Sequence, residues 1–148
     1  MLLALLFTSL LIAQKMQEKV IPAAVTSAFK TKFPTATKAS WEFENKMEYE
    51  AEFKLNDEEV TANFDNTGRW LETETEIKIS ELPAVIQSIL KKDFADFKVE
   101  EASKIESLKN GNCFEAEIEK GEETFDVLFS TDGKVLSKTK LEEKEKKD

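Results

Sequence analysis

The sequence predicts an α+β fold, a tandem repeat of one helix plus four antiparallel strands, with the helices packed on one face of a curved antiparallel sheet. Each of two helical segments is followed by four segments that alternate apolar and polar residues. Landmarks also recur at a nearly constant spacing, because Pro22 and Pro83 lie 61 residues apart and Gly68 and Gly133 lie 65 apart. One strand occurs almost twice, as YEAEF at 49–53 and FEAEI at 114–118.

The first thirteen residues, MLLALLFTSLLIA, carry no charge. A membrane-spanning helix needs about 20 apolar residues, so this stretch is too short to span and is typical of the apolar part of a secretory signal. We expect a signal peptide over 1–13, a linker over 14–20, and a periplasmic or extracellular protein with no membrane span after signal removal. The alternative is that these residues form a helix or strand of the fold.

The first repeat is expected over 21–79 and the second over 80–141. Each helix begins at a proline, which suits a first turn because the missing N–H is not needed there. Apolar residues then recur every three or four positions and line one helical face. The residues on these faces are Val25, Ala28, Phe29 and Phe33 in the first repeat, and Ile86, Ile89, Leu90 and Phe94 in the second.

The eight predicted strands are separated by turn signals rich in Asn, Asp and Gly. They are 40–44, 47–53, 59–64 and 70–77 in the first repeat, and 99–106, 113–118, 124–129 and 134–141 in the second. The mixed-charge segment 142–148 has no apolar period and is predicted to be a disordered tail.

One repeat of about 60 residues makes a marginal core by itself, so two copies are expected to share an edge or a core. The first core is expected to contain Phe29, Phe33, Trp41, Phe43, Phe53 and Phe64. The second is expected to contain Leu90, Phe94, Phe114, Ile118, Phe129 and Leu136.

Glutamates occupy the strand positions between these apolar residues, so they should line the opposite face of the sheet. Like charges on neighbouring strands repel, which favours a cationic partner. Three interpretations stay open: a solvated face offset by lysines, a surface for a basic protein segment, or a site for a Ca²⁺-like ion. The candidate partner-binding carboxylates are Glu50, Glu52, Glu72, Glu74, Glu115 and Glu117.

Trp70 completes the candidate binding set. Strict alternation places it with Glu72 and Glu74 on the polar face, where an exposed tryptophan would be an interface anchor. A bulge after Gly68 would instead turn it inward, as a partly buried structural residue.

The composition excludes several classes of function. The chain has 21 basic and 30 acidic residues, a net charge of −9, and no basic cluster that would bind nucleic acid. It has no histidine, and Cys113 is the single cysteine, so no intramolecular disulfide forms. Acidic neighbours should raise the pKa of Cys113, which is expected to be structural. We predict no catalytic residues, no cofactor and no metal ligand set.

Several motifs resemble the PepSY-like family of bacterial proteins, also described as β-lactamase-inhibitor-like. They are the segments 21–34 (IP…AFKTKFP), 39–42 (ASWE), 49–53 (YEAEF), 62–77 (ANFDNTGRWLETETEI) and 82–90 (LPAVIQSIL). The resemblance covers about residues 20–141. It implies a secreted protein whose helices cover one side of a sheet while the other side grips a protein partner.

The leading hypothesis is therefore a non-enzymatic exported protein that binds another protein, either basic or a hydrolase or peptidase that it inhibits. The alternative is a small-ligand or cation carrier that uses the acidic face.

Overall fold

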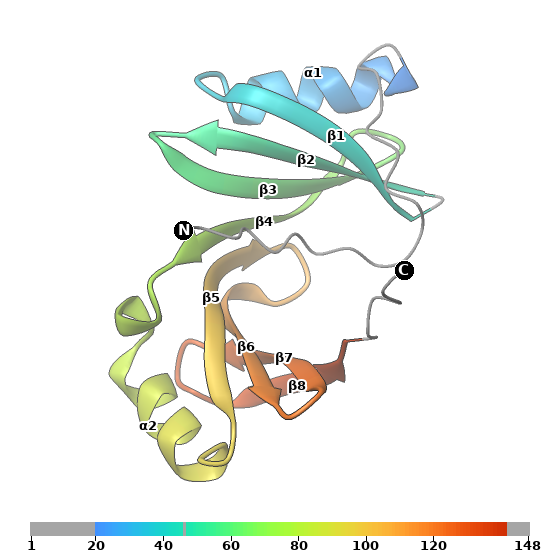
Figure 1. Ribbon diagram of the computed structural model, residues 1–148. Helices are drawn as coiled ribbons and strands as arrows, with labels where there is room; N and C mark the ends of the chain where they lie inside the picture. The colour runs from blue at the N-terminus through green and yellow to red at the C-terminus, as the bar shows by residue number, and fades with distance from the viewer. Residues whose placement is uncertain (1–19, 46, 142–148) are drawn as a thin grey trace.

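The computed structural model describes residues 20–45 and 47–141 (Figure 1). The predicted signal peptide, most of the linker and the tail lie outside these residues. The elements of the first half are α1 (Ala23–Lys32), β1 (Thr37–Asn45), β2 (Glu48–Leu55), β3 (Glu58–Asp65) and β4 (Trp70–Ile77). After a 3₁₀ turn at Ile79–Glu81 come α2 (Ala84–Asp93), β5 (Lys98–Ser107), β6 (Gly111–Lys120), β7 (Glu123–Ser130) and β8 (Val135–Lys140).

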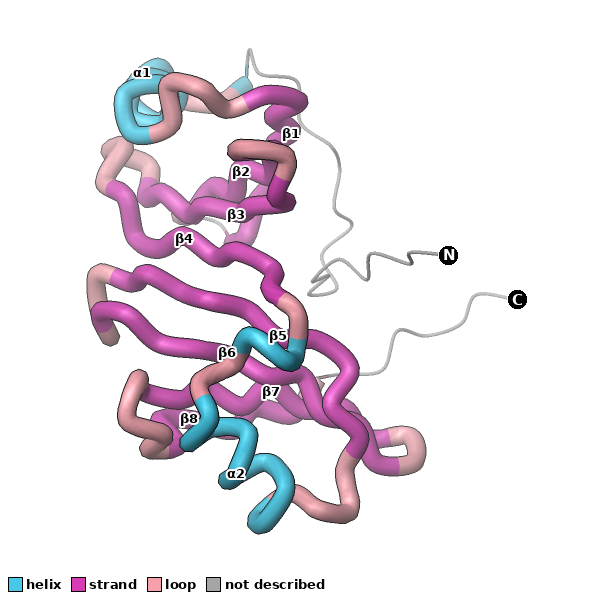
Figure 2. Tube along the Cα trace, turned by 90° about the vertical axis from the view of Figure 1, so that its left-hand side faces the viewer, coloured by secondary structure: helices cyan, strands magenta, loops and turns pink. Residues whose placement is uncertain are grey.

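The eight strands form one antiparallel sheet in which each strand pairs with the next along the chain. The edges of the sheet are therefore β1 and β8. In both views the strands follow one another from β1 to β8, and the two helices lie near opposite ends of the sheet (Figure 2). The two helices and eight strands predicted from the sequence are all present, with boundaries shifted by up to three residues.

Both helices begin and end for the same local reasons. A proline with extended ψ precedes each helix, at Pro22 and Pro83. Each last turn carries two lysines, whose positive charge stabilises the carbonyl end of the helix. The helices are only ten residues long, so their stability comes mainly from packing against the sheet.

Each helix covers its own hydrophobic cluster. Phe29 of α1 lies at the centre of the first cluster, with ring centroids 5.2 Å from Trp41 and 5.0 Å from Phe53. The second cluster joins α2 to the sheet through fully buried Ile86, with Phe129 beneath it. Edge-to-face ring pairs of the kind formed by Phe29 are worth about 0.5–1.5 kcal/mol beyond the burial of their area.

The strand register places both clusters on the same face of the sheet. Ala62, in the first cluster, pairs with Thr73 of β4. Two and four residues further along β4, Thr75 and Ile77 point the same way, and Ile77 pairs with Ala102 of the second cluster. Neither α1 nor α2 lies on the opposite surface of the sheet, which we call the helix-free face and which is thus continuous across both halves.

Two predicted core residues are wrong. Phe43 is 46% exposed and Leu136 is 40% exposed. Phe43 lies near one end of edge strand β1, where its ring contacts Tyr49, and Leu136 lies on edge strand β8. Alternation assigned each residue to a face, but Leu136 is the extra residue of an irregularity in β8, because Val135 pairs with Phe129 and Ser137 pairs with Leu128.

Two glycines allow the helices to approach the sheet closely. Gly68 has φ of +86° and Gly133 has φ of +90°, a left-handed region that other residues rarely adopt. A Cβ on Gly68 would lie 2.5 Å from the carbonyl oxygen of Ala24 in α1. A Cβ on Gly133 would lie 2.8 Å from Ile89 of α2.

No helix among the residues described is long and apolar enough to cross a membrane.

We predict that Gly68→Ala destabilises the protein much more than Gly121→Ala. Both glycines have positive φ, which costs about 1–2 kcal/mol for an L-residue. A Cβ at Gly121 meets no atom within 4 Å, whereas one at Gly68 collides with helix backbone. Urea unfolding of both variants measures the difference, and equal midpoints would contradict the close approach of α1.

Candidate functional site

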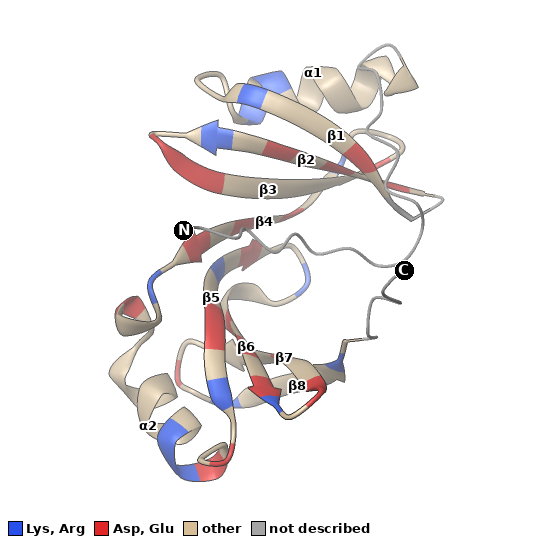
Figure 3. Cartoon of the chain, in the orientation of Figure 1, with Lys and Arg blue, Asp and Glu red and all other residues tan. Residues whose placement is uncertain are grey.

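The helix-free face carries the acidic residues of neighbouring strands side by side. Glu50 of β2 pairs with Asn63 of β3, which pairs in turn with Glu72 of β4. Two residues further along β4, Glu74 pairs with Thr61 of β3. Figure 3 shows Asp and Glu recurring along the strands from β2 to β6.

The middle of this face is buried although neither α1 nor α2 covers it. Ile105 of β5 and Cys113 of β6 face each other in register, and they are only 3% and 1% exposed. Neither belongs to the two helix-covered clusters. Ser103 and Asp126 are each 9% exposed on the same face. The face is therefore hollowed at its centre.

Carboxyl groups in this hollow hold their protons unusually tightly. Burial, followed by the charges of neighbouring carboxylates, raises the pKa of Glu115 to about 8. Burial likewise raises the pKa of Glu74 to about 7, although a hydrogen bond with Ser103 acts in the opposite direction. Burial and Glu101 raise the pKa of Asp126 to about 6. A uniformly solvated face would leave these carboxyls near their ordinary values.

We call the carboxyl groups that share this hollow the acidic cluster. Its members influence one another's pKa values and come from four adjacent strands. They are Glu72, Glu74, Glu101, Glu115, Glu117 and Asp126.

A cavity of about 190 Å³ opens among these side chains, across β2 to β6. We call it the acidic cavity. Four of the predicted binding carboxylates line it together with polar side chains of β3 and one apolar residue of β5. The lining residues include Glu50, Glu72, Glu74, Glu115, Thr61, Asn63 and Ile105.

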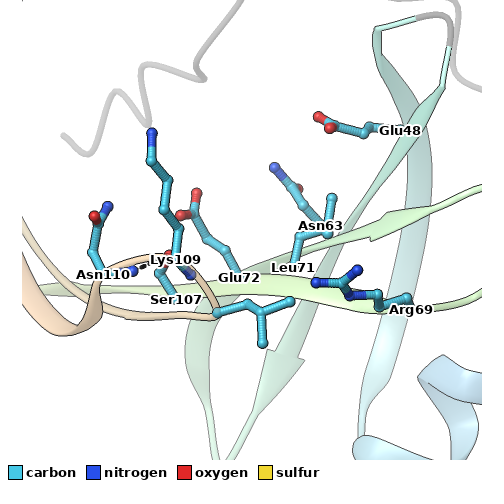
Figure 4. Close-up of a pocket in the computed structure, with 9 residues that line it drawn as sticks. Glu48, Asn63, Arg69, Leu71, Glu72, Ser107, Lys109 and Asn110 are labelled. Carbon is cyan, nitrogen blue, oxygen red and sulfur yellow. Dashed lines mark hydrogen bonds between the residues drawn. The ribbon is translucent and has the colours of Figure 1, made fainter.

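A larger hollow of about 490 Å³ adjoins the acidic cavity and shares Asn63 and Glu72 with it. Positive side chains also reach this hollow, from Arg69 just before β4 and Lys109 after β5. Figure 4 shows Lys109 and Glu72 beside each other, with Arg69 on the opposite side of the hollow. This end of the face has mixed charge, in contrast to the acidic cavity.

Two of the other predicted residues lie on the helix-free face outside the acidic cavity. Glu52 pairs with Ser40 and Thr61, further along β2. Glu117 lies between Glu101 and Asp126 on adjacent strands, within the acidic cluster.

Trp70 is not part of this site. A register shift between Asn63 and Phe64 places Trp70 opposite buried Phe64, so the bulge alternative holds. The indole packs against the first cluster and donates a 2.8 Å hydrogen bond from Nε1 to the Thr73 hydroxyl. Lys32 of α1 lies 3.9 Å from the ring centroid, a cation–π contact. Grouping Trp70 with Glu72 and Glu74 was therefore wrong.

Cys113 has the raised pKa that the sequence predicts, at about 11, but the main cause is different. Burial contributes most, and the charges of Glu72, Glu115 and Glu74 follow. A thiolate is scarce at neutral pH, which fits a structural residue.

Within the described part of the chain, no three His, Cys, Asp or Glu side chains converge in a way that would hold a metal ion. The acidic cluster is thus spread along the sheet instead of gathered around one point.

Sequence reasoning missed several residues of the site. Asp126 stands between Phe125 and Val127 in a mostly apolar strand. A charged residue at such a position is a signal that could have identified it as a site residue. Asn63 and Thr61 carry no charge and had no distinctive pattern. Arg69 and Lys109 flank predicted strands, and only the strand order brings them to one hollow.

The two helices and eight strands of the described residues form the fold of the β-lactamase-inhibitor-like class. The chain belongs to the PepSY-like family: the family model described as "Putative beta-lactamase-inhibitor-like, PepSY-like" matches residues 11–61 and 47–137. The family points to a non-catalytic protein. The curated proteins include no match to this chain.

Solved structures share the fold. A BLIP-like protein from Bacteroides fragilis is 25% identical with a TM-score of 0.71, and the match covers 86% of this chain and 92% of that one. A DUF2874 family protein from Bacteroides uniformis is 20% identical with a TM-score of 0.73, over 80% and 88% of the two chains. A protein from Bacteroides eggerthii described as "putative periplasmic" is 23% identical with a TM-score of 0.71, over 80% and 88%.

We predict that the protein is more stable at pH 5 than at pH 8.5. Because Glu74 and Glu115 have raised pKa values, the folded state binds more protons than the unfolded state in this range. The free energy of unfolding should therefore fall as pH rises, by roughly 3 kcal/mol for Glu74 and roughly 4 kcal/mol for Glu115, since one pKa unit corresponds to about 1.36 kcal/mol. Urea unfolding across this range measures the slope.

Two double variants, each of which removes two carboxyl groups, separate the effect of Glu74 and Glu115 from a general effect of net charge. Glu74→Gln/Glu115→Gln should flatten the slope, whereas Glu58→Gln/Glu122→Gln, at exposed positions, should leave it unchanged. An equal slope in all three proteins would contradict the assignment.

We predict that Trp70→Ala lowers the free energy of unfolding by about 2–4 kcal/mol, because it removes a partly buried ring from the first cluster. Trp70→Phe keeps most of the packing and should cost less. Denaturant unfolding measures both, and an unchanged stability of Trp70→Ala would restore the interface interpretation.

Proposed function

We propose that this protein is a non-enzymatic, exported protein that binds another protein through the helix-free face of its sheet. The observation that supports this proposal is the hollow at the centre of that face. It concentrates desolvated carboxyl groups on a surface that is continuous across two halves and that neither α1 nor α2 covers. Such a surface is costly for the fold by itself, and a partner that supplies donors would offset the cost.

The family description and the BLIP-like relative favour a hydrolase as the partner, with inhibition as the consequence of binding. Export is supported by the apolar segment 1–13 and by the description of one structural relative as periplasmic. We also infer that the two halves arose by duplication of one helix and four strands. Equivalent turns support this, since Gly68 N–H donates to Asp65 O and Gly133 N–H donates to Ser130 O, both at 2.9 Å.

Capture of a partner from a bacterial periplasmic extract tests the proposal. The bait without residues 1–13 is compared with Glu74→Gln/Glu115→Gln and with the control Glu58→Gln/Glu122→Gln. We expect one protein to be retained by the parent and the control, at least about tenfold above the face variant. Identical retention by all three baits would contradict binding through this face.

Purified partner then decides the consequence of binding. If the partner is a hydrolase, its turnover of a chromogenic substrate is measured with increasing amounts of the parent and of the face variant. Inhibition by the parent alone supports the inhibitor role. Undiminished turnover by the saturated complex would exclude that role and leave a binding function.

A further inference from the structure

Three phenylalanines of the second half surround one ammonium group. The Nζ atom of Lys138 lies 4.0 Å from the ring centroid of Phe125, 4.7 Å from that of Phe97 and 5.6 Å from that of Phe94. The rings stand at steep angles to one another, because Phe97 makes interplanar angles of 71° with Phe94 and 79° with Phe125. The ring centroids of these two pairs are 6.1 and 5.8 Å apart. We call the three rings the phenyl cage.

The phenyl cage lies at the β8 edge of the sheet, on the side opposite the helix-free face. Lys138 pairs with Val127 of the second cluster, and cross-strand partners project from the same face of a sheet. The Lys138 side chain is therefore on the helix-covered side. Strand β8 is exposed along its whole length, and the three rings are only partly buried. A small ligand can thus reach the rings once the Lys138 side chain moves aside.

The fold itself does not require the phenyl cage. Equivalent hydrogen bonds and strand pairs identify the corresponding positions of the first half. Smaller aliphatic side chains stand there in place of two of the three rings, and a threonine stands in place of the lysine. The first-half residues are Phe33, Ala36, Val60 and Thr73, corresponding to Phe94, Phe97, Phe125 and Lys138. The first half packs its helix without these rings, so packing alone does not explain them.

A primary ammonium is not the cation that three phenyl rings suit best. The face of each ring attracts positive charge. Phenyl rings offer no oxygen or nitrogen acceptor, however, to the three N–H groups of a lysine ammonium, which is strongly hydrated. A quaternary ammonium has no N–H group to satisfy, and its methyl groups pack directly against the rings. Helix α2 also ends at Phe94, and the negative end of a helix dipole favours a nearby cation.

We propose that the phenyl cage binds a quaternary ammonium group of the choline type, and that Lys138 occupies the cage until this ligand displaces it. A cation–π contact at an exposed site is weak, so the lysine leaves the rings at little cost. This site lies on the opposite side of the sheet from the surface in the proposed function, so the two stand or fall separately. The ammonium group belongs either to a soluble molecule or to a lipid headgroup.

Titration with choline and with ethanolamine, followed by proton NMR at neutral pH, tests this proposal. Both probes carry one positive charge, and they differ only in the three methyl groups on nitrogen. We expect choline to bind roughly tenfold more tightly than ethanolamine, with its N-methyl signal shifted upfield by the ring faces. Equal affinity of the two cations would overturn the proposal, because it would indicate attraction by the net negative charge of the protein alone.

Two pairs of variants locate the binding. Phe125→Leu keeps an apolar side chain and should weaken choline binding about tenfold, whereas Phe43→Leu, at an exposed ring of the first half, should not. Lys138→Gln removes the competing cation and should tighten choline binding roughly threefold, whereas Lys134→Gln makes the same change of charge and should not. The lysine pair lies at exposed positions, so it decides the matter even if Phe125→Leu does not fold. Equal effects within the lysine pair would overturn the proposal.

Flotation with phosphatidylcholine vesicles distinguishes the two sources of the ammonium group. Retention of the parent protein on the vesicles, lost in Phe125→Leu and kept in Phe43→Leu, would support the proposal with a lipid headgroup as the ligand. Choline binding without retention on vesicles would support it with a soluble ligand. Retention that Phe125→Leu leaves unchanged, in a protein that does not prefer choline over ethanolamine, would overturn it.

Discussion

The pairing of β4 with β5 is the constraint on which the rest of this structure depends. Six consecutive residue pairs, from Glu72–Ser107 to Ile77–Ala102, join the last strand of the first half to the first strand of the second. Because side chains alternate strictly, this register decides that both helices cover the same face. A slip by one residue would place the apolar side chains of one half on the same face as the carboxylates of the other half.

The same pairing creates the site. Glu72 and Glu74 belong to the first half and Glu115 belongs to the second, and they meet only because β4 and β5 are adjacent. Carboxylates nearer the edges, such as Glu52, line no part of the acidic cavity. A half-protein would thus have the acidic residues and lack the hollow, so the hollow is a property of the joined sheet.

The sequence predicted the elements and the faces well, because alternation, prolines and glycines are local signals. It predicted less well which of the apolar side chains are buried. Phe43 has the right period but lies near the end of edge strand β1, where it is 46% exposed. Leu136 is the extra residue of a register shift in β8 and is 40% exposed. Trp70 changed faces because a bulge beside Phe64 broke the alternation. A bulge depends on the geometry of the partner strand, which the sequence of β4 alone does not contain.

The site itself was predictable only in part, for an electrostatic reason. Every outward glutamate looks alike in the sequence, yet the pKa of a carboxyl depends on how much water remains around it. Strand order places Glu74 and Glu115 over a buried centre formed by Ile105 and Cys113, and there desolvation outweighs the hydrogen bond that Ser103 provides to Glu74. The acidic pattern therefore identified the face, whereas the position within the sheet decides which carboxyls have raised pKa values.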